Sequence, residues 1–183
     1  MENIKVLSNQ KVIKYLLTIF LGSLLLTISA KIKIPFYPVP MTMQTFIVVL
    51  MGVTFGWKIG VATISLYLLE GIIGFPVFAG TPEKGLGLVY FMGPTMGYLI
   101  GFLFAAFLAG YLNLKTNIFL IFLKLILSVS IIYILGILWL GHLIGWDKPL
   151  LELGVMPFLL AELFKISLLT ILTKKLIKFR KFI

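Results

Sequence analysis

A carboxylate and an amine stand three residues apart in an apolar stretch near the C-terminus, PFLLAELFKISLL, residues 157–169. Residues three apart share one face of a helix, so Glu162 and Lys165 can pair with each other. A charge in the middle of a membrane-spanning helix costs about 2.5–3.5 kcal/mol, so two charges need compensating partners. Two interpretations stay open: a pair that only neutralises itself, or a ligand site where the carboxylate accepts N–H bonds and the ammonium meets an anion.

Other reactive residue types are sparse. Glu70 is a second acid at similar depth, unless it simply reaches the membrane interface. With no cysteine and one histidine, His142, the sequence excludes disulfides and iron–sulfur ligation and makes a metal site improbable. No phosphate-binding loop of the form GxxxxGK[ST] occurs, so we expect any energy for uphill transport to come from another subunit. No cofactor and no enzymatic activity are predicted.

The composition indicates the elements that must position these residues. Of 183 residues, 61% are hydrophobic and 12% are charged, and the mean hydropathy is +1.14. This is more apolar surface than a soluble domain of this size could bury, so we expect an integral membrane protein with one domain, residues 1–183. The net charge of +10 comes from lysines in short connections. These lysines indicate topology and contacts with anionic lipid, not nucleic acid.

Apolar windows predict an all-α protein of six transmembrane helices, at residues 12–30, 41–56, 59–73, 92–112, 117–140 and 155–173. The second and third are short and separated only by Gly56, Trp57 and Lys58, a broken-helix pattern found near substrate sites in transporters. If the N-terminus is cytoplasmic, ten Lys and Arg residues lie on that side and four on the other. This asymmetry predicts that both termini are cytoplasmic.

Small residues and one long loop complete the pattern. The loop GFPVFAGTPEKGLG, residues 74–87, is too apolar to extend into water, so we expect a cap over a cavity, the alternative being a disordered loop. A ridge of small residues favours close helix packing inside the bundle over contact with a partner. The ridge comprises Gly93, Gly97, Gly101, Ala105 and Ala109. Ser23 and Thr27 form a weaker small-residue pair that fits either role.

Four stretches together resemble one known family. They are IPFYPVPMTMQTF (34–46), LYLLEGIIGFPVFAGTPEKGLG (66–87), GPTMGYLIGFLFAAFLAG (93–110) and GVMPFLLAELFK (154–165). In this order and spacing they resemble the BioY family, the biotin-specific S components of energy-coupling-factor (ECF) transporters. The resemblance implies the six-helix S-component fold, biotin bound near the outer face, and capping loops at residues 31–40 and 74–87.

The resemblance also implies roles for individual residues. Glu162 should accept biotin's ureido N–H bonds, with Lys165 as a positive anchor and Lys84 as the partner of the valerate carboxylate. Further binding candidates are Gln44, Glu70, Tyr98 and Phe78, and the capping-loop glycines are Gly80, Gly85 and Gly87. Many relatives carry Asp where this chain has Glu162. They also often dock through an Ala-xxx-Ala pattern on the first helix, and here Ser23 and Thr27 are its nearest equivalent.

The implied setting is the bacterial cytoplasmic membrane, and the implied partners are a transmembrane scaffold subunit and two cytoplasmic ATPase subunits. Two alternatives remain. One is an S component for a different vitamin, which the PVFAG and GPTMGYLIGF motifs disfavour. The other is a membrane assembly subunit without a ligand, which the cost of inserting the polar residues disfavours.

Overall fold

The computed structural model describes residues 2–181, with side chains from residue 9 onward. The long helices are α1 (Glu2–Lys31), α2 (Gln44–Phe55), α3 (Trp57–Ile73), α5 (Met96–Tyr111), α6 (Ile118–Ile144) and α8 (Leu159–Leu176). The short elements are α4 (Leu88–Phe91), α7 (Leu150–Gly154), η1 (Met156–Phe158) and η2 (Ile177–Lys181). Strands β1 (Lys33–Ile34) and β2 (Met41–Thr42) pair antiparallel. The predicted all-α architecture is thus confirmed apart from this small hairpin.

Each predicted apolar window overlaps one long helix, and α1, α3, α6 and α8 extend beyond their windows. Among the residues that the structure describes, three stretches are long and apolar enough to cross a membrane, at Asn9–Lys31, Ile118–Ile144 and Leu150–Lys181. Helices α2 and α5 are apolar but shorter, with 12 and 16 residues. The second window was predicted to begin at residue 41, but α2 begins at Gln44, because residues 41 and 42 form β2.

A single residue, Gly56, connects α2 to α3. The predicted three-residue connection is wrong, because Trp57 and Lys58 already belong to α3. Gly56 has φ +83°, which residues with a Cβ rarely adopt. The corner also packs tightly on α5, since a Cβ built on Gly110 would lie 2.2 Å from the Trp57 nitrogen. The chain can therefore reverse direction within one residue.

The ridge of small residues on α5 packs inside the bundle, as predicted. A Cβ on Gly97 would lie 2.3 Å from the Leu135 carbonyl oxygen, and one on Gly101 would lie 2.6 Å from Ile132 Cα, both on α6. Ala105 and Ala109 are completely buried. The absence of bulk lets α5 approach α6 and α2 closely.

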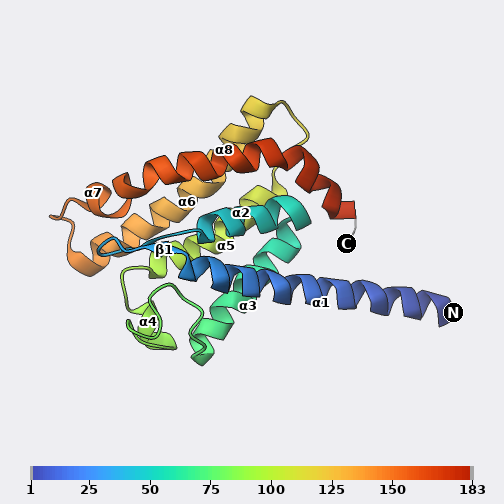
Figure 1. Cartoon of the computed structure of the whole chain (residues 1–183), viewed down its shortest axis with the longest axis horizontal. Helices are drawn as coiled ribbons and strands as arrows, with labels where there is room; N and C mark the ends of the chain where they lie inside the picture. Colours follow the sequence, from blue (N-terminus) through green and yellow to red (C-terminus); the bar gives the residue numbers. More distant parts are fainter. Residues whose placement is uncertain (1, 182–183) are drawn as a thin grey trace.

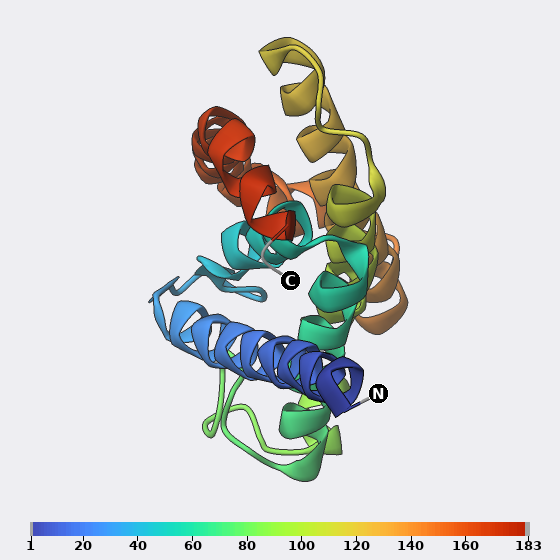
Figure 2. The same cartoon turned by 90° about the vertical axis from the view of Figure 1, so that its right-hand side faces the viewer.

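The bundle has two distinct ends. The N-terminal end of α1 and the C-terminal turn η2 lie at one end, and the loops around α4 and α7 lie at the other (Figure 1). In the view along the bundle, α1 and α8 lie on either side of the β1–β2 segment (Figure 2). At the loop end, residues of β2, α4 and α8 come together around a cavity.

Candidate ligand-binding site

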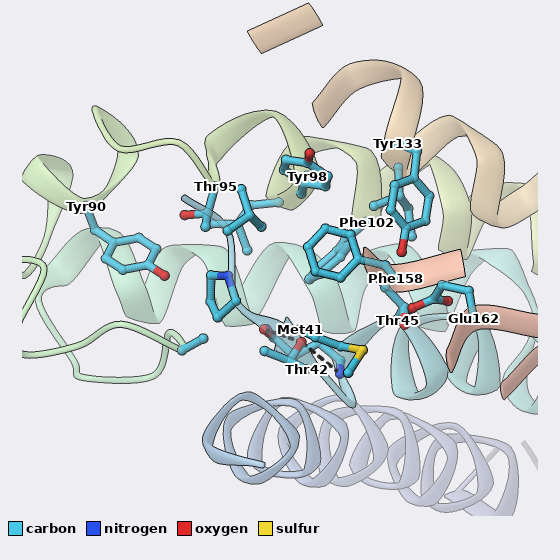
Figure 3. Close-up of a pocket in the computed structure, with 16 residues that line it drawn as sticks. Met41, Thr42, Thr45, Tyr90, Thr95, Tyr98, Phe102, Tyr133, Phe158 and Glu162 are labelled. Atoms are coloured by element: carbon cyan, nitrogen blue, oxygen red, sulfur yellow. Dashed lines mark hydrogen bonds between the residues drawn. The ribbon is translucent and has the colours of Figure 1, made fainter. Parts of the chain in front are cut away.

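A narrow cavity lies at the loop end of the bundle. It is lined by the β2 segment, the start of α2, the 74–87 loop, α4, α5, α6, η1 and α8 (Figure 3). Its free volume is about 50 Å³, room for a few water molecules. The cavity combines aromatic walls with convergent polar groups, the usual composition of a small-molecule site.

The Glu162 carboxylate forms one polar end of this cavity. Glu162 is 5% exposed, and its Oε1 accepts a hydrogen bond of 2.7 Å from Thr45 Oγ1. The same oxygen pairs with Lys165 Nζ at 2.7 Å. Tyr133 on α6 also interacts with this carboxylate, and Figure 3 places its ring above Glu162. The buried charge is therefore compensated from α2, α6 and α8.

Lys165 lies behind Glu162 and does not line this cavity. Its Nζ donates to Thr42 O at 2.6 Å, to Thr45 Oγ1 at 3.0 Å and to Glu162 Oε1 at 2.7 Å. An ammonium group has three N–H donors, so these contacts occupy all of them. The predicted ion pair exists, and of its two members only the carboxylate faces the cavity.

Gln44 and Tyr98 line the cavity, as expected for binding residues, but both already have partners. Gln44 Nε2 donates to Tyr67 Oη at 2.7 Å, and Tyr98 Oη donates to Gly154 O at 2.9 Å. These bonds fix the two side chains in place. Tyr98 therefore presents a fixed ring edge or face, which suits an apolar part of a ligand.

Phe78 does not reach the cavity. It is 1% exposed, stacks on Tyr90 with ring centroids 4.7 Å apart, and fills the space that a side chain at Gly71 would occupy. Its neighbour Ala79 lines the cavity instead. Contrary to the prediction from the sequence, Phe78 therefore does not offer its ring to the cavity. Its buried ring instead fastens the 74–87 loop to the bundle.

Lys84 lies outside the main cavity. It is exposed, and its Nζ donates to Pro38 O at 3.4 Å. It lines an adjacent cavity of about 340 Å³ that shares Tyr90 and Thr95 with the main one. Lys84 is therefore placed where a ligand extending past Tyr90 would end.

Glu70 is separated from the cavity and pairs with the first helix. Ser23 Oγ donates to Glu70 Oε2, and Ser23 is completely buried between α1 and α3. Thr27 Oγ1 donates to Ser23 O, one turn back on α1, at 3.1 Å. Of the two roles left open for Ser23, internal packing is the one observed, and Glu70 is satisfied there without a ligand.

Two loops cover the cavity and are fastened to each other by lysines. Lys31 Nζ donates to Phe78 O at 2.9 Å and to Thr81 O at 3.2 Å, while Lys33 Nζ donates to Ala79 O at 2.8 Å. We call these contacts between the 31–40 and 74–87 loops the lysine clasp. The 74–87 loop is thus fastened beside the cavity, and its role as a cap over a ligand stays a prediction.

The turns of the cap depend on its glycines and on Tyr90. Gly85 and Gly87 have φ of +95° and +63°, and a side chain at Gly80 would collide with Lys84. The Gly80 N–H donates to Tyr90 Oη at 3.3 Å. Burial raises the pKa of Tyr90, so its phenol stays neutral at physiological pH.

Three polar residues around the Glu162–Lys165 pair escaped prediction: Thr42, Thr45 and Tyr133. Thr95 and Tyr90, farther along the cavity, escaped it too. Thr42 and Thr45 flank Gln44 in the PVPMTMQT stretch, and a polar cluster at the start of an apolar helix could have indicated them. Tyr133 stands in the apolar run IIYILG and carries no comparable signal. Among the described residues no group of three or more His, Cys, Asp or Glu could hold a metal ion.

Comparison with known proteins places this site in a family. The BioY family model matches residues 3–182, nearly the whole chain. The chain belongs to the BioY family. A probable biotin transporter BioY from Pyrococcus horikoshii is 35% identical over 83% of this chain and 89% of its own length. The biotin transporter BioY of Thermotoga maritima is 36% identical over 84% and 90%.

The fold is also that of a protein of known structure. The crystal structure of the S component for biotin from an ECF-type ABC transporter superposes with a TM-score of 0.77. That protein is 28% identical, and the match covers 93% of each chain. Members of this family are membrane transporters and not enzymes, in agreement with the composition and the apolar helices of this chain.

Proposed function

We propose that this chain is the biotin-binding S component of an ECF-type transporter and serves biotin uptake. The observation that carries the proposal is the buried Glu162 carboxylate at the end of an aromatic cavity beneath two fastened loops, in a chain of the BioY family. Biotin's ureido ring carries two N–H donors, which suit a carboxylate acceptor.

The geometry supports a specific placement of biotin. The ureido ring lies against Glu162, and the rings of Tyr98 and Phe158 flank the apolar thiophane ring. The valerate chain passes Tyr90 and ends near Lys84 in the adjacent cavity. Because the free volume is only about 50 Å³, biotin enters only if the cap and the side chains around it move apart. Lys165 acts behind Glu162, where it forms an ion pair with the carboxylate at 2.7 Å.

The proposal extends to the membrane setting. The excess of basic residues at the end with the termini orients that end to the cytoplasm of a bacterial cell, with six helices across the cytoplasmic membrane. The chain has no phosphate-binding loop, so a transmembrane scaffold subunit and two cytoplasmic ATPase subunits supply the energy.

Biotin binding to the purified chain in detergent tests the proposal. Isothermal titration calorimetry should show saturable binding of one biotin per chain, with no heat from riboflavin or thiamine at the same concentration. Saturable binding of another vitamin would show an S component of different specificity. Absence of binding by all three, in a chain that unfolds cooperatively on heating, would favour an assembly subunit.

A further inference from the structure

A second cavity lies at the end of the bundle that carries the termini. It has a volume of about 480 Å³ and lies between α1, the α2–α3 corner and η2. Its wall is mostly apolar, with Tyr15 and Trp57 among the lining residues and two cationic side chains, Lys58 and Arg180. It shares no lining residue with the proposed biotin cavity.

Arg180 is held rigidly at this cavity by backbone carbonyls. Its Nε donates to Val53 O at 2.9 Å, and its Nη2 donates to Gly52 O at 3.3 Å and to Ala109 O at 3.5 Å. These bonds cap the ends of α2 and α5. Nη1 takes part in none of them. The guanidinium therefore has one fixed edge and one edge for a further acceptor, and its planar fork suits a phosphate.

Lys58 supplies a second cation beside it. Its Nζ lies 5.7 Å from the centre of the Trp57 ring, and no ion pair to Lys58 occurs in the described part of the chain. The acidic residues with described side chains are Glu70, Glu83, Asp147, Glu152 and Glu162, and none of them lines this cavity. The positive charge here is thus left for an outside anion.

We propose that this cavity binds one anionic phospholipid. The phosphate lies between Arg180 Nη1 and Lys58, and one acyl chain follows the apolar wall formed by Ile19 and Ile59. Tyr15 and Trp57, each 40% exposed, have the amphipathic rings typical of the membrane interface. Basic pockets between transmembrane helices, set at headgroup depth, bind anionic lipid headgroups, and this cavity has both their charge and their apolar wall.

Native mass spectrometry of the full chain tests the site, with phosphatidylglycerol and phosphatidylcholine added in equal amounts. The wild type should retain one phosphatidylglycerol in preference to phosphatidylcholine. Lys58→Gln should weaken this retention about fivefold, the effect of one charge near the headgroup. Lys115→Gln is the matched control, because it removes an exposed lysine outside the cavity and should change nothing. Biotin affinity should be unchanged in both variants.

Other outcomes would overturn the proposal. Equal retention of both lipids would show that the cavity does not select an anionic headgroup. Equal losses in the two variants would show only general attraction between a basic surface and anionic lipid. Unchanged lipid retention in Lys58→Gln, together with weaker co-purification of the scaffold subunit, would show that a protein partner occupies the cavity. Arg180→Lys keeps the charge but not the fork, so it should also lower retention, and a thermal unfolding curve identifies any loss of folding.

Discussion

One hydroxyl group, that of Thr45, connects the two buried charges of the site. An ammonium only donates and a carboxylate only accepts, whereas a hydroxyl does both. Thr45 Oγ1 accepts from Lys165 and donates to Glu162, so its proton position is determined by its neighbours. Because the three groups form one network, the loss of any member removes a hydrogen bond from another buried polar group.

Replacing Glu162 with Gln should weaken biotin binding by about 1.5–3 kcal/mol, roughly 10- to 150-fold, because a charged acceptor becomes neutral. Glu162→Asp keeps the charge and should therefore keep most of the wild-type affinity for biotin. Calorimetric titration measures both, and Glu152→Gln, on the exposed side of α7, is the control. Unchanged biotin affinity in a folded Glu162→Gln variant would show that another group receives the ureido ring.

Thr45→Val should lower the stability of the protein by about 1–3 kcal/mol, because both charged neighbours lose a partner. Thr63 offers a matched comparison. Its hydroxyl is buried and has no hydrogen-bond partner in the described structure, so Thr63→Val should be neutral or stabilising. Thermal unfolding in detergent compares the two variants. Equal effects would mean that the Thr45 bonds contribute nothing beyond side-chain volume.

Lys84→Ala should weaken biotin about fivefold and leave biotin amide, which lacks the carboxylate, unaffected. The reason is the position of Lys84 at the adjacent cavity, where the valerate chain would end. Competition binding with the two ligands measures the difference, and Lys148→Ala in an exposed loop is the control. Equal losses of affinity for biotin and for biotin amide would show that Lys84 only supports the structure of the loop.

At the scale of elements, the two capping loops form a single cover. The lysine clasp joins them through backbone carbonyls of the 74–87 loop, and Phe78 fastens that loop to α3 and α4. Hydrogen bonds between a lysine and loop carbonyls can exchange with water, whereas a buried aromatic ring cannot leave at low cost. The cover should therefore open at the clasp while the Phe78 anchor stays in place.

A cysteine at Ala79 reports this opening, because the chain has no other cysteine. Ala79 is 4% exposed and lines the cavity, so Ala79→Cys should react slowly with a maleimide. Lys33→Gln removes the bond to the Ala79 carbonyl and should accelerate the reaction, while biotin should slow it. Lys148→Cys should react fast under all conditions. Rates independent of both biotin and Lys33 would exclude a moving cover.

Hydropathy and residue size were sufficient to predict the helices and their close packing. The α5 ridge is an example, because an interval of four places Gly97 and Gly101 on one face whatever the partner helix is. Contacts across the chain could not be predicted in this way. Lys165 binds Thr42 and Thr45, which are more than 100 residues away in sequence. The local path of the cap likewise decides that Ala79, and not Phe78, faces the cavity.

At the scale of the whole molecule, the two ends of the bundle differ in charge and in the sites that they carry. The end with the termini carries most of the basic residues and the proposed lipid site, and the loop end carries the cavity and the lysine clasp. Helix α6 joins the ends. Its 27 residues extend about 40 Å, more than the roughly 30 Å hydrocarbon core of a bilayer.

Cysteines placed before and after α6 should therefore be accessible to a maleimide from opposite sides of the membrane. We expect Lys148→Cys to react with an impermeant maleimide added to intact cells, and Lys115→Cys to react only after permeabilisation. The excess of basic residues at the end with the termini is the physical reason. Reaction of Lys115→Cys in intact cells would show that the protein has the opposite orientation in the membrane.

The shortness of α2 affects how far a bound solute still has to travel. From Thr45, beside the proposed ureido site, to Gly56 at the corner, the chain advances 11 helical steps, or about 16 Å. This is about half of the hydrocarbon thickness. In the proposed placement, a biotin beside Thr45 would have completed about half of its dehydrated path, and release would need an opening about three helical turns deep. The other half of the path would be left to the proposed energy-coupling subunits.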